Sequence, residues 1–153
     1  MASIEIRDSF PEDVNLIKGK LRPADTEEIL AFGITAAKAL WRSYKGAIFR
    51  RTAFVDGEIA AIWGCGGTVM GDVGRPWLLT TYAAEKISPL RFTRIYQDEV
   101  LRMLDVFPRL VNYVDSRYTK ATRLLDIIGF ELDEPEPVGV NGILFQKFEM
   151  RAV

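Results

Sequence analysis

Gly64-Cys65-Gly66-Gly67 is the segment whose residue types most resemble a reactive site, because it places a thiol among glycines at the end of a predicted strand. A cysteine nucleophile needs a neighbouring base or cation that stabilises the thiolate. The chain contains no histidine, and no lysine or arginine lies close to Cys65 in sequence. Two interpretations remain, a reactive exposed thiol or a small buried residue beside tightly packed backbone, and the pattern favours the second.

The absence of histidine has a wider consequence for function. It removes every Ser-His and Cys-His mechanism and the usual general base near neutral pH. With one cysteine and no histidine, most zinc chemistry and any intramolecular disulfide are excluded as well. Acid–base chemistry in this chain must therefore use Asp, Glu, Tyr, Lys, Cys or water, and we expect no metal site.

Length and charge describe an ordinary globular chain. The 153 residues fit one domain spanning 1–153, and 48% are hydrophobic. Lysine and arginine number 20 against 21 acidic residues, which gives no electrostatic reason to expect nucleic acid or a membrane surface as partner. No apolar run approaches the roughly 20 residues of a membrane span, and the N-terminus lacks a signal-peptide pattern. We therefore expect a cytoplasmic protein.

The strands that would position reactive groups follow from hydrophobic periodicity. The pattern predicts strands over 4–7, 48–55, 58–63, 77–82, 110–115, 130–132 and 143–150. Asp56-Gly57 is a strong turn signal between the second and third of these strands. The segment 71–76 is expected to be a loop.

Helices are expected before the main sheet and again in the second half of the chain. Ser9 is predicted as an N-cap, with Pro11 in the first turn, and a similar signal at 25–28 is followed by helical spacing over 37–44. A long helix follows Ser88 and ends at Pro108, and a short amphipathic helix is closed by glycine 129. This order predicts an α+β domain with a mixed, mainly antiparallel sheet of six to seven strands and about four helices.

The segment 121–131, ATRLLDIIGFE, resembles the "A-x-x-L-Y-x-x-x-G-F" segment of the GNAT (Gcn5-related) N-acetyltransferases. The order of elements resembles that family over most of the chain, whereas sequence-level similarity is confined to about 110–132. The resemblance implies a GNAT-like fold and acetyl-coenzyme A (acetyl-CoA) as a possible cofactor. In such a fold the fourth and fifth strands splay apart, and the pantetheine arm of the cofactor bonds the backbone groups that this exposes.

The loop that holds the pyrophosphate of CoA in this family differs here. The family pattern is Q/R-x-x-G-x-G/A before the long helix, where glycines let backbone N–H groups approach the phosphates. The corresponding stretch 83–91 contains no glycine, carries Glu85, and has Pro89 where an N–H donor is wanted. Lys86 and Arg91, with Arg94 behind them, could still attract an anion, although solvated charges on an exposed turn are the simpler interpretation.

The tyrosine that serves as general acid in the family is also missing. Its position here is Leu125, which cannot donate a proton. Tyr118 is two turns away on the predicted helix, and Tyr113 and Tyr82 could substitute, but both are more typical of half-buried tyrosines in a sheet. The resemblance therefore identifies no catalytic residue, and whether the chain is an enzyme stays open.

If acyl-CoA binds, the resemblance implies a set of contacts for it. Thr80, Thr81 and Asn112 would supply polar contacts along the splayed strands, while Lys86 and Arg91 would face the phosphates. The alternative is that the two threonines and the asparagine are ordinary polar residues on a partly solvated strand face.

A second resemblance is closer along the chain. The runs 77–80, 91–96, 111–115 and 128–130 resemble a group of small tailed-phage proteins related to internal virion protein A of short-tailed coliphages. This similarity implies a role in virion morphogenesis in the infected or lysogenic cell, with phage structural or assembly proteins as partners. Three functions are consistent with the sequence: an assembly protein with acetyltransferase chemistry lost or impaired, an acetyl-CoA-dependent N-acetyltransferase with a divergent pyrophosphate loop, and a binder of another ligand in the same cleft.

Overall fold

The computed structural model describes residues 2–21, 36–67, 70–137 and 142–153. The predicted capping signal at 25–28 lies outside these residues. The elements in chain order are β1 (Ile4–Asp8), α1 (Pro11–Ile17), α3 (Ala36–Gly46), β2 (Ala47–Val55), β3 (Glu58–Gly66), β4 (Val73–Thr80), the 3₁₀ helix η1 (Tyr82–Lys86), α4 (Pro89–Val106), β5 (Arg109–Asp115), α5 (Thr119–Ile128), β6 (Glu131–Leu132), β7 (Glu136–Pro137) and β8 (Leu144–Arg151).

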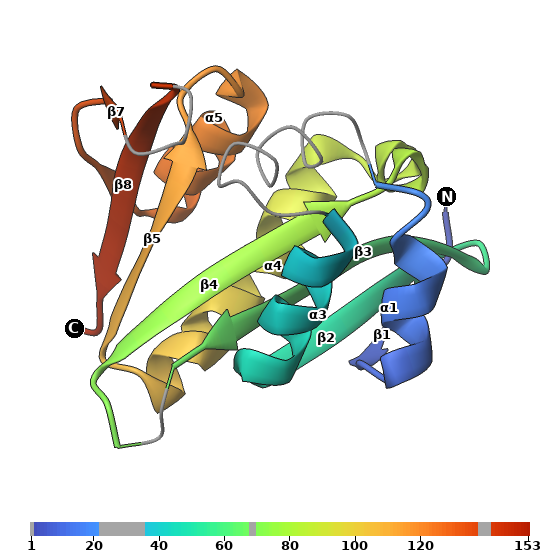
Figure 1. Cartoon of the computed structure of the whole chain (residues 1–153). Coiled ribbons are helices and arrows are strands. Elements are labelled where there is room, and N and C mark those ends of the chain that lie inside the picture. The colour runs from blue at the N-terminus through green and yellow to red at the C-terminus, as the bar shows by residue number, and fades with distance from the viewer. Residues whose placement is uncertain (1, 22–35, 68–69, 138–141) are drawn as a thin grey trace.

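The described residues form one eight-stranded sheet with the order β1-β2-β3-β4-β5-β8-β6, and β7 also pairs with β8. Among these strand pairs only β4 and β5 run parallel. Helices α1 and α3 cover one face of the sheet and α4 covers the other (Figure 1). The prediction of an α+β fold with a mixed, mainly antiparallel sheet is confirmed.

Strand β3 lies at the centre of this arrangement and is buried on both faces. Trp63 and Cys65 point to the side of α4, where they pack with Met103 and Phe107. Ile62 points the other way, into a cluster with residues of α1 and α3. Because both faces are covered, β3 is an almost continuous apolar run.

Strand β4 begins earlier than predicted. The expected loop over 71–76 is wrong, since Val73 and Gly74 pair with β5, and Arg75 and Pro76 pair with β3. Proline is tolerated here because its missing N–H would point to the edge facing β5, not to the ladder with β3. Glycine and proline in this segment therefore indicate close packing and a switch of pairing from β5 to β3, and not a loop.

The N-terminus of α1 is also built differently from the prediction. Ser9 is not the N-cap, because its hydroxyl is bonded to the Thr52 hydroxyl at 2.7 Å. Phe10 takes the N-cap position, and the Asp13 carboxylate accepts the Phe10 N–H at 2.8 Å. The predicted ends of the later helices are confirmed, with Ser88 capping α4 and the left-handed Gly129 closing α5.

Candidate cofactor cleft

The parallel strands β4 and β5 stay together for a short distance only. Within these two fully described strands, the paired positions are Val73 with Arg109 and Gly74 with Leu110. Beyond them the strands diverge toward their C-terminal ends, as Figure 1 shows. Beyond the last pair no ladder joins the facing edges of β4 and β5, so the region between the diverging strands is the candidate site.

The side chain of Asn112 spans the gap just past the last ladder pair. Its Nδ2 donates to the Pro76 carbonyl at 2.8 Å, and its Oδ1 accepts the Tyr113 N–H at 2.9 Å. One amide thus satisfies an acceptor on β4 and a donor on β5 where no backbone rung joins the strands. Asn112 does lie between β4 and β5, as the resemblance implied, but its polar atoms are already bonded within the protein.

Beyond Asn112, alternate residues of β4 direct their backbone to the side that faces β5. Because the Pro76 carbonyl faces β5, the strand alternation directs the backbone of Leu78 and Thr80 to the same side. Thr81 has the opposite parity and donates its N–H to the Ala60 carbonyl of β3 at 2.9 Å. The predicted residue Thr80 therefore lines the opening with its backbone.

Thr81 has a structural role at the open end of the cleft. Its side chain is 3% exposed, and its hydroxyl donates to the Ile59 carbonyl at 2.7 Å while accepting the Ala83 N–H at 3.2 Å. The hydroxyl thus caps η1 and ties it to β3. Contact between this hydroxyl and a ligand would require one of these bonds to break.

The turn that corresponds to the pyrophosphate loop uses its own N–H groups. Besides Ala83, the N–H of Ala84 is bonded to the Thr81 carbonyl and that of Ile87 to the Ala84 carbonyl. At the start of α4, the Arg91 N–H is bonded to the Ser88 hydroxyl at 3.3 Å. In a glycine loop such N–H groups would bind the phosphates. Here they form hydrogen bonds within a 3₁₀ turn and a helix cap.

The two predicted phosphate-facing cations lie at this same turn. Lys86 ends η1, and its ammonium is 3.1 Å from the Glu58 carboxylate. Arg91 lies in the first turn of α4 and donates to the Ala2 carbonyl at 3.0 Å. The Lys86 pair is solvent-exposed and therefore weak, so an anion could compete for this ammonium. The structure places Thr81, Lys86 and Arg91 at the turn and helix start that follow β4, with partners on β3 and before β1, and places Asn112 between β4 and β5.

Leu125, at the family's general-acid position, and the three candidate tyrosines lie on different elements. Leu125 is 7% exposed and packs in the core between the sheet, α4 and α5. Tyr113 is half-buried on β5, as predicted, whereas Tyr82 lies on η1 and is 59% exposed, so its prediction as a sheet tyrosine is wrong. Tyr118 is the N-cap of α5, with the Arg117 guanidinium 5.6 Å from its ring centroid.

The sequence pattern does not predict the burial of the acidic residue at the C-terminal end of β5. Asp115 is fully buried, and the Arg117 guanidinium binds its carboxylate with a shortest separation of 2.6 Å. The Arg117 N–H also donates to Asp115 at 2.9 Å. The sequence signal for this ion pair is an aspartate at the end of a strand with an arginine two residues later. The Asp115 carboxylate is therefore already hydrogen-bonded to Arg117 at the C-terminal end of β5.

Cys65 is a packed core residue. Its side chain is fully buried, and burial raises the pKa of the thiol to about 12. A thiolate is therefore scarce at neutral pH, and the nucleophile interpretation is excluded. We expect iodoacetamide to modify the folded protein at least a hundredfold more slowly than the urea-unfolded chain, measured by mass spectrometry. Equal rates for the two states would contradict this packing.

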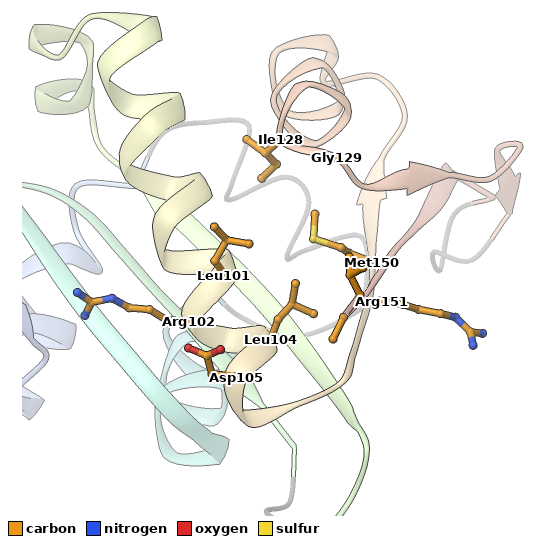
Figure 2. Close-up of a pocket in the computed structure, with 10 residues that line it drawn as sticks. Leu101, Arg102, Leu104, Asp105, Ile128, Gly129, Met150 and Arg151 are labelled. Carbon is orange, nitrogen blue, oxygen red and sulfur yellow. The ribbon is translucent and has the colours of Figure 1, made fainter.

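A hollow of about 600 Å³ lies between α4, the end of α5 and the end of β8. Figure 2 shows Leu101 and Leu104 of α4 facing Ile128 of α5 and Met150 of β8 across it. Arg102, Asp105 and the chain end from 151 to 153 complete the wall. In the parts of the chain described here, no helix could span a membrane and no cluster of side chains could hold a metal ion.

No family model matches this chain, and no curated protein matches it. Solved structures do match across nearly its whole length. A GNAT-family acetyltransferase from Streptococcus pneumoniae is 16% identical, with a TM-score of 0.65, covering 99% of this chain and 100% of that one. The acetyltransferase yncA from Salmonella typhimurium, solved with acetyl-CoA, is 12% identical, with a TM-score of 0.65 and coverage of 97% and 94%.

A ribosomal-protein α-N-acetyltransferase in complex with CoA also matches. It is 9% identical, with a TM-score of 0.69, and the alignment covers 97% of this chain and 94% of that one. At these identities the similarity shows the fold and not the activity. The chain has the GNAT acetyltransferase fold.

Proposed function

We propose that this chain binds an acyl-CoA in the cleft between β4 and β5 and acts as an N-acyltransferase with a divergent pyrophosphate site. The observation that carries the proposal is the early end of the β4–β5 ladder, which directs the Leu78 and Thr80 backbone to an opening between parallel strands. A pantetheine arm has two amides, which can pair with such an edge as a short strand does. Two matching structures of this fold contain acetyl-CoA or CoA.

The chemistry needs few residues. The acceptor amine attacks the thioester carbonyl, the carbon–sulfur bond breaks, and CoA leaves as the thiolate, so the rate depends mainly on holding both reactants in line. With no histidine in the chain and Leu125 in the core, the amine proton passes to water or to a carboxylate, and the thiolate is protonated from solvent. Lys86 and Arg91 would meet the phosphates after leaving Glu58 and the Ala2 carbonyl.

Calorimetric titration with acetyl-CoA tests the proposal. We expect micromolar binding to the wild-type chain, and at least tenfold weaker binding when Lys86→Ala and Arg91→Ala are combined, because each change removes a charge-assisted phosphate contact. A matched control combines Lys18→Ala with Arg102→Ala, two exposed cations away from the cleft mouth. No heat from the wild type at millimolar acetyl-CoA would overturn the proposal.

A second candidate function is favoured by the turn at the cleft mouth. There the N–H groups of Ala83, Ala84 and Ile87 are bonded within the turn, and Leu125 stands where an acid is needed. A chain with these changes could act through protein contacts alone, as the resemblance to phage virion proteins implies, with assembly proteins of a phage as partners. Failure to bind acetyl-CoA, together with specific capture of virion proteins from infected cells, would support this function over the first.

A further inference from the structure

Glu99 is a buried carboxylate on the inner face of α4 whose hydrogen-bonding capacity the surrounding side chains leave almost unused. Its Oε1 lies 3.4 Å from Arg51 Nη2, whereas charge-assisted hydrogen bonds to a carboxylate measure about 2.7–2.9 Å. Its Oε2 has no hydrogen-bond partner among the described residues. Asp13, on the other face of the sheet and buried to a similar degree, accepts four hydrogen bonds. A buried charge left in the state of Glu99 needs a further partner.

Two more unpartnered atoms lie on the strands beneath Glu99. In the described parts of the chain, the buried side-chain atoms without a hydrogen-bond partner are Glu99 Oε2, Arg51 Nε, Trp63 Nε1 and Trp77 Nε1. Arg51 and Trp63 are directly opposite in the antiparallel β2–β3 pair, so their side chains share the face that α4 covers. Tyr96, one turn before Glu99, packs edge-on against Trp63 with ring centroids 6.2 Å apart. Trp77 packs on the opposite face. Three of the four atoms therefore gather under one turn of α4.

We propose that Glu99, Arg51 and Trp63 together bind an internal water molecule that joins α4 to β2 and β3. Arg51 Nε and Trp63 Nε1 carry one hydrogen each and can only donate, whereas the Glu99 carboxylate can only accept. A water molecule accepts two hydrogen bonds and donates to a third group, which matches these three atoms. A bound anion would face the carboxylate, and a bound cation would face the guanidinium and the indole N–H, so neither fits. The site is independent of the proposed acyl-CoA binding.

Arg51 also gives the water a route to solvent. Its Nη1 donates to the exposed Asp8 carboxylate at 3.1 Å, at the edge of the layer between α4 and the sheet. Trp63 and Glu99 are almost fully buried and close the site on the inner side. Exchange of the water therefore requires Arg51 to move toward Asp8, so the bound molecule is held far longer than water on the protein surface.

The test is water-selective NOE spectroscopy on the isotope-labelled whole chain, observed at the indole N–H of Trp63. Trp63→Phe identifies this signal among those of the three tryptophans. In the wild type we expect a cross-peak to water with the sign of a long-lived bound molecule. Glu99→Leu replaces the acceptor with an apolar side chain and should abolish the cross-peak. Asp98→Leu is the matched control at the neighbouring exposed position of α4, and should leave the cross-peak unchanged.

Tyr96→Phe guards against a signal relayed through the Tyr96 hydroxyl, since this ring contacts Trp63. The cross-peak should persist in that variant, and its loss there would mean that the hydroxyl was its source. Absence of the cross-peak from the wild type overturns the proposal, and so does an unchanged cross-peak in Glu99→Leu. A crystal structure with Arg51 Nε and Nη2 both bonded to Glu99 would overturn it too. If Glu99→Leu does not fold, the spectra of the wild type and Tyr96→Phe decide.

Discussion

Replacing Asp13 with alanine is expected to lower the free energy of unfolding by about 3–5 kcal/mol, because it leaves buried donors without their acceptor. The carboxylate is 3% exposed. It receives two hydrogen bonds from Arg7, at 2.8 and 2.9 Å, one from the Phe10 N–H at 2.8 Å and one from the Thr52 hydroxyl at 2.9 Å. The change therefore removes the contacts that join β1, α1 and β2. Urea denaturation monitored by tryptophan fluorescence measures the loss.

Glu12→Ala is the matched control, since Glu12 lies in the same turn of α1 with an exposed side chain. We expect a change of at most about 0.5 kcal/mol for it, as for most surface substitutions. A loss below about 1 kcal/mol for Asp13→Ala would show that the network contributes little to stability.

The same carboxylate should contribute to acid sensitivity. Burial raises the pKa of Asp13, but the hydrogen bonds from Arg7, the Phe10 N–H and Thr52 outweigh burial and hold the pKa below its ordinary value. A lowered folded-state pKa means that the stabilisation is fully present above the ordinary aspartate range. It is lost as the pH falls through that range toward the folded pKa. The stability difference between wild type and Asp13→Ala should therefore shrink between about pH 5 and pH 2.

The N-termini of α1 and α4 show what local sequence can and cannot predict. Ser88 and Pro89 carry a complete N-terminal signal, and the Ser88 hydroxyl accepts the Arg91 N–H as a cap, so the prediction is confirmed. Ser9 carries an equally good signal, but its hydroxyl is hydrogen-bonded to the Thr52 hydroxyl instead of capping the helix. The partner that decides is 43 residues away, and only the paired strands bring it close.

The candidate site also has one feature that the sequence predicts and others that it does not. A fold with one strand–helix–strand crossover implies a parallel pair, and the resemblance implies that this pair splays; the short β4–β5 ladder agrees with both. The Asn112 bridge between these strands does not follow from the sequence, because it depends on the offset between β4 and β5, which places the Pro76 carbonyl within 2.8 Å. The bonding inside η1 was also hidden, since a glycine-free turn of this composition could equally be open. Long-range register sets the Asn112 bridge, whereas the bonds inside η1 are local and join residues two or three positions apart.

Gly74→Ala is expected to lower the free energy of unfolding by about 3 kcal/mol and to disturb the closed end of the cleft, because its Cβ has no room. That atom would lie 2.6 Å from the Phe107 ring and 2.7 Å from the Cys65 sulfur. Phe107 and Cys65 are both fully buried, so neither can move aside without opening the core. Gly74 also pairs with Leu110 in the last rung before the strands diverge, so displacement of β4 here would alter the spacing of β4 and β5.

Gly66→Ala is a matched control on the neighbouring strand, since its Cβ would meet neighbours at 3.6 and 4.0 Å, which is ordinary contact. We expect its free energy of unfolding, from urea denaturation, to stay within about 0.5 kcal/mol of wild type. Combining Gly74→Ala with Cys65→Ala removes the sulfur that the new methyl meets, and should recover part of the loss if the crowding is local. Additive losses in the double variant would instead mean that the methyl is accommodated by a shift of β4, with the cost arising at the β4–β5 rung and not in the core.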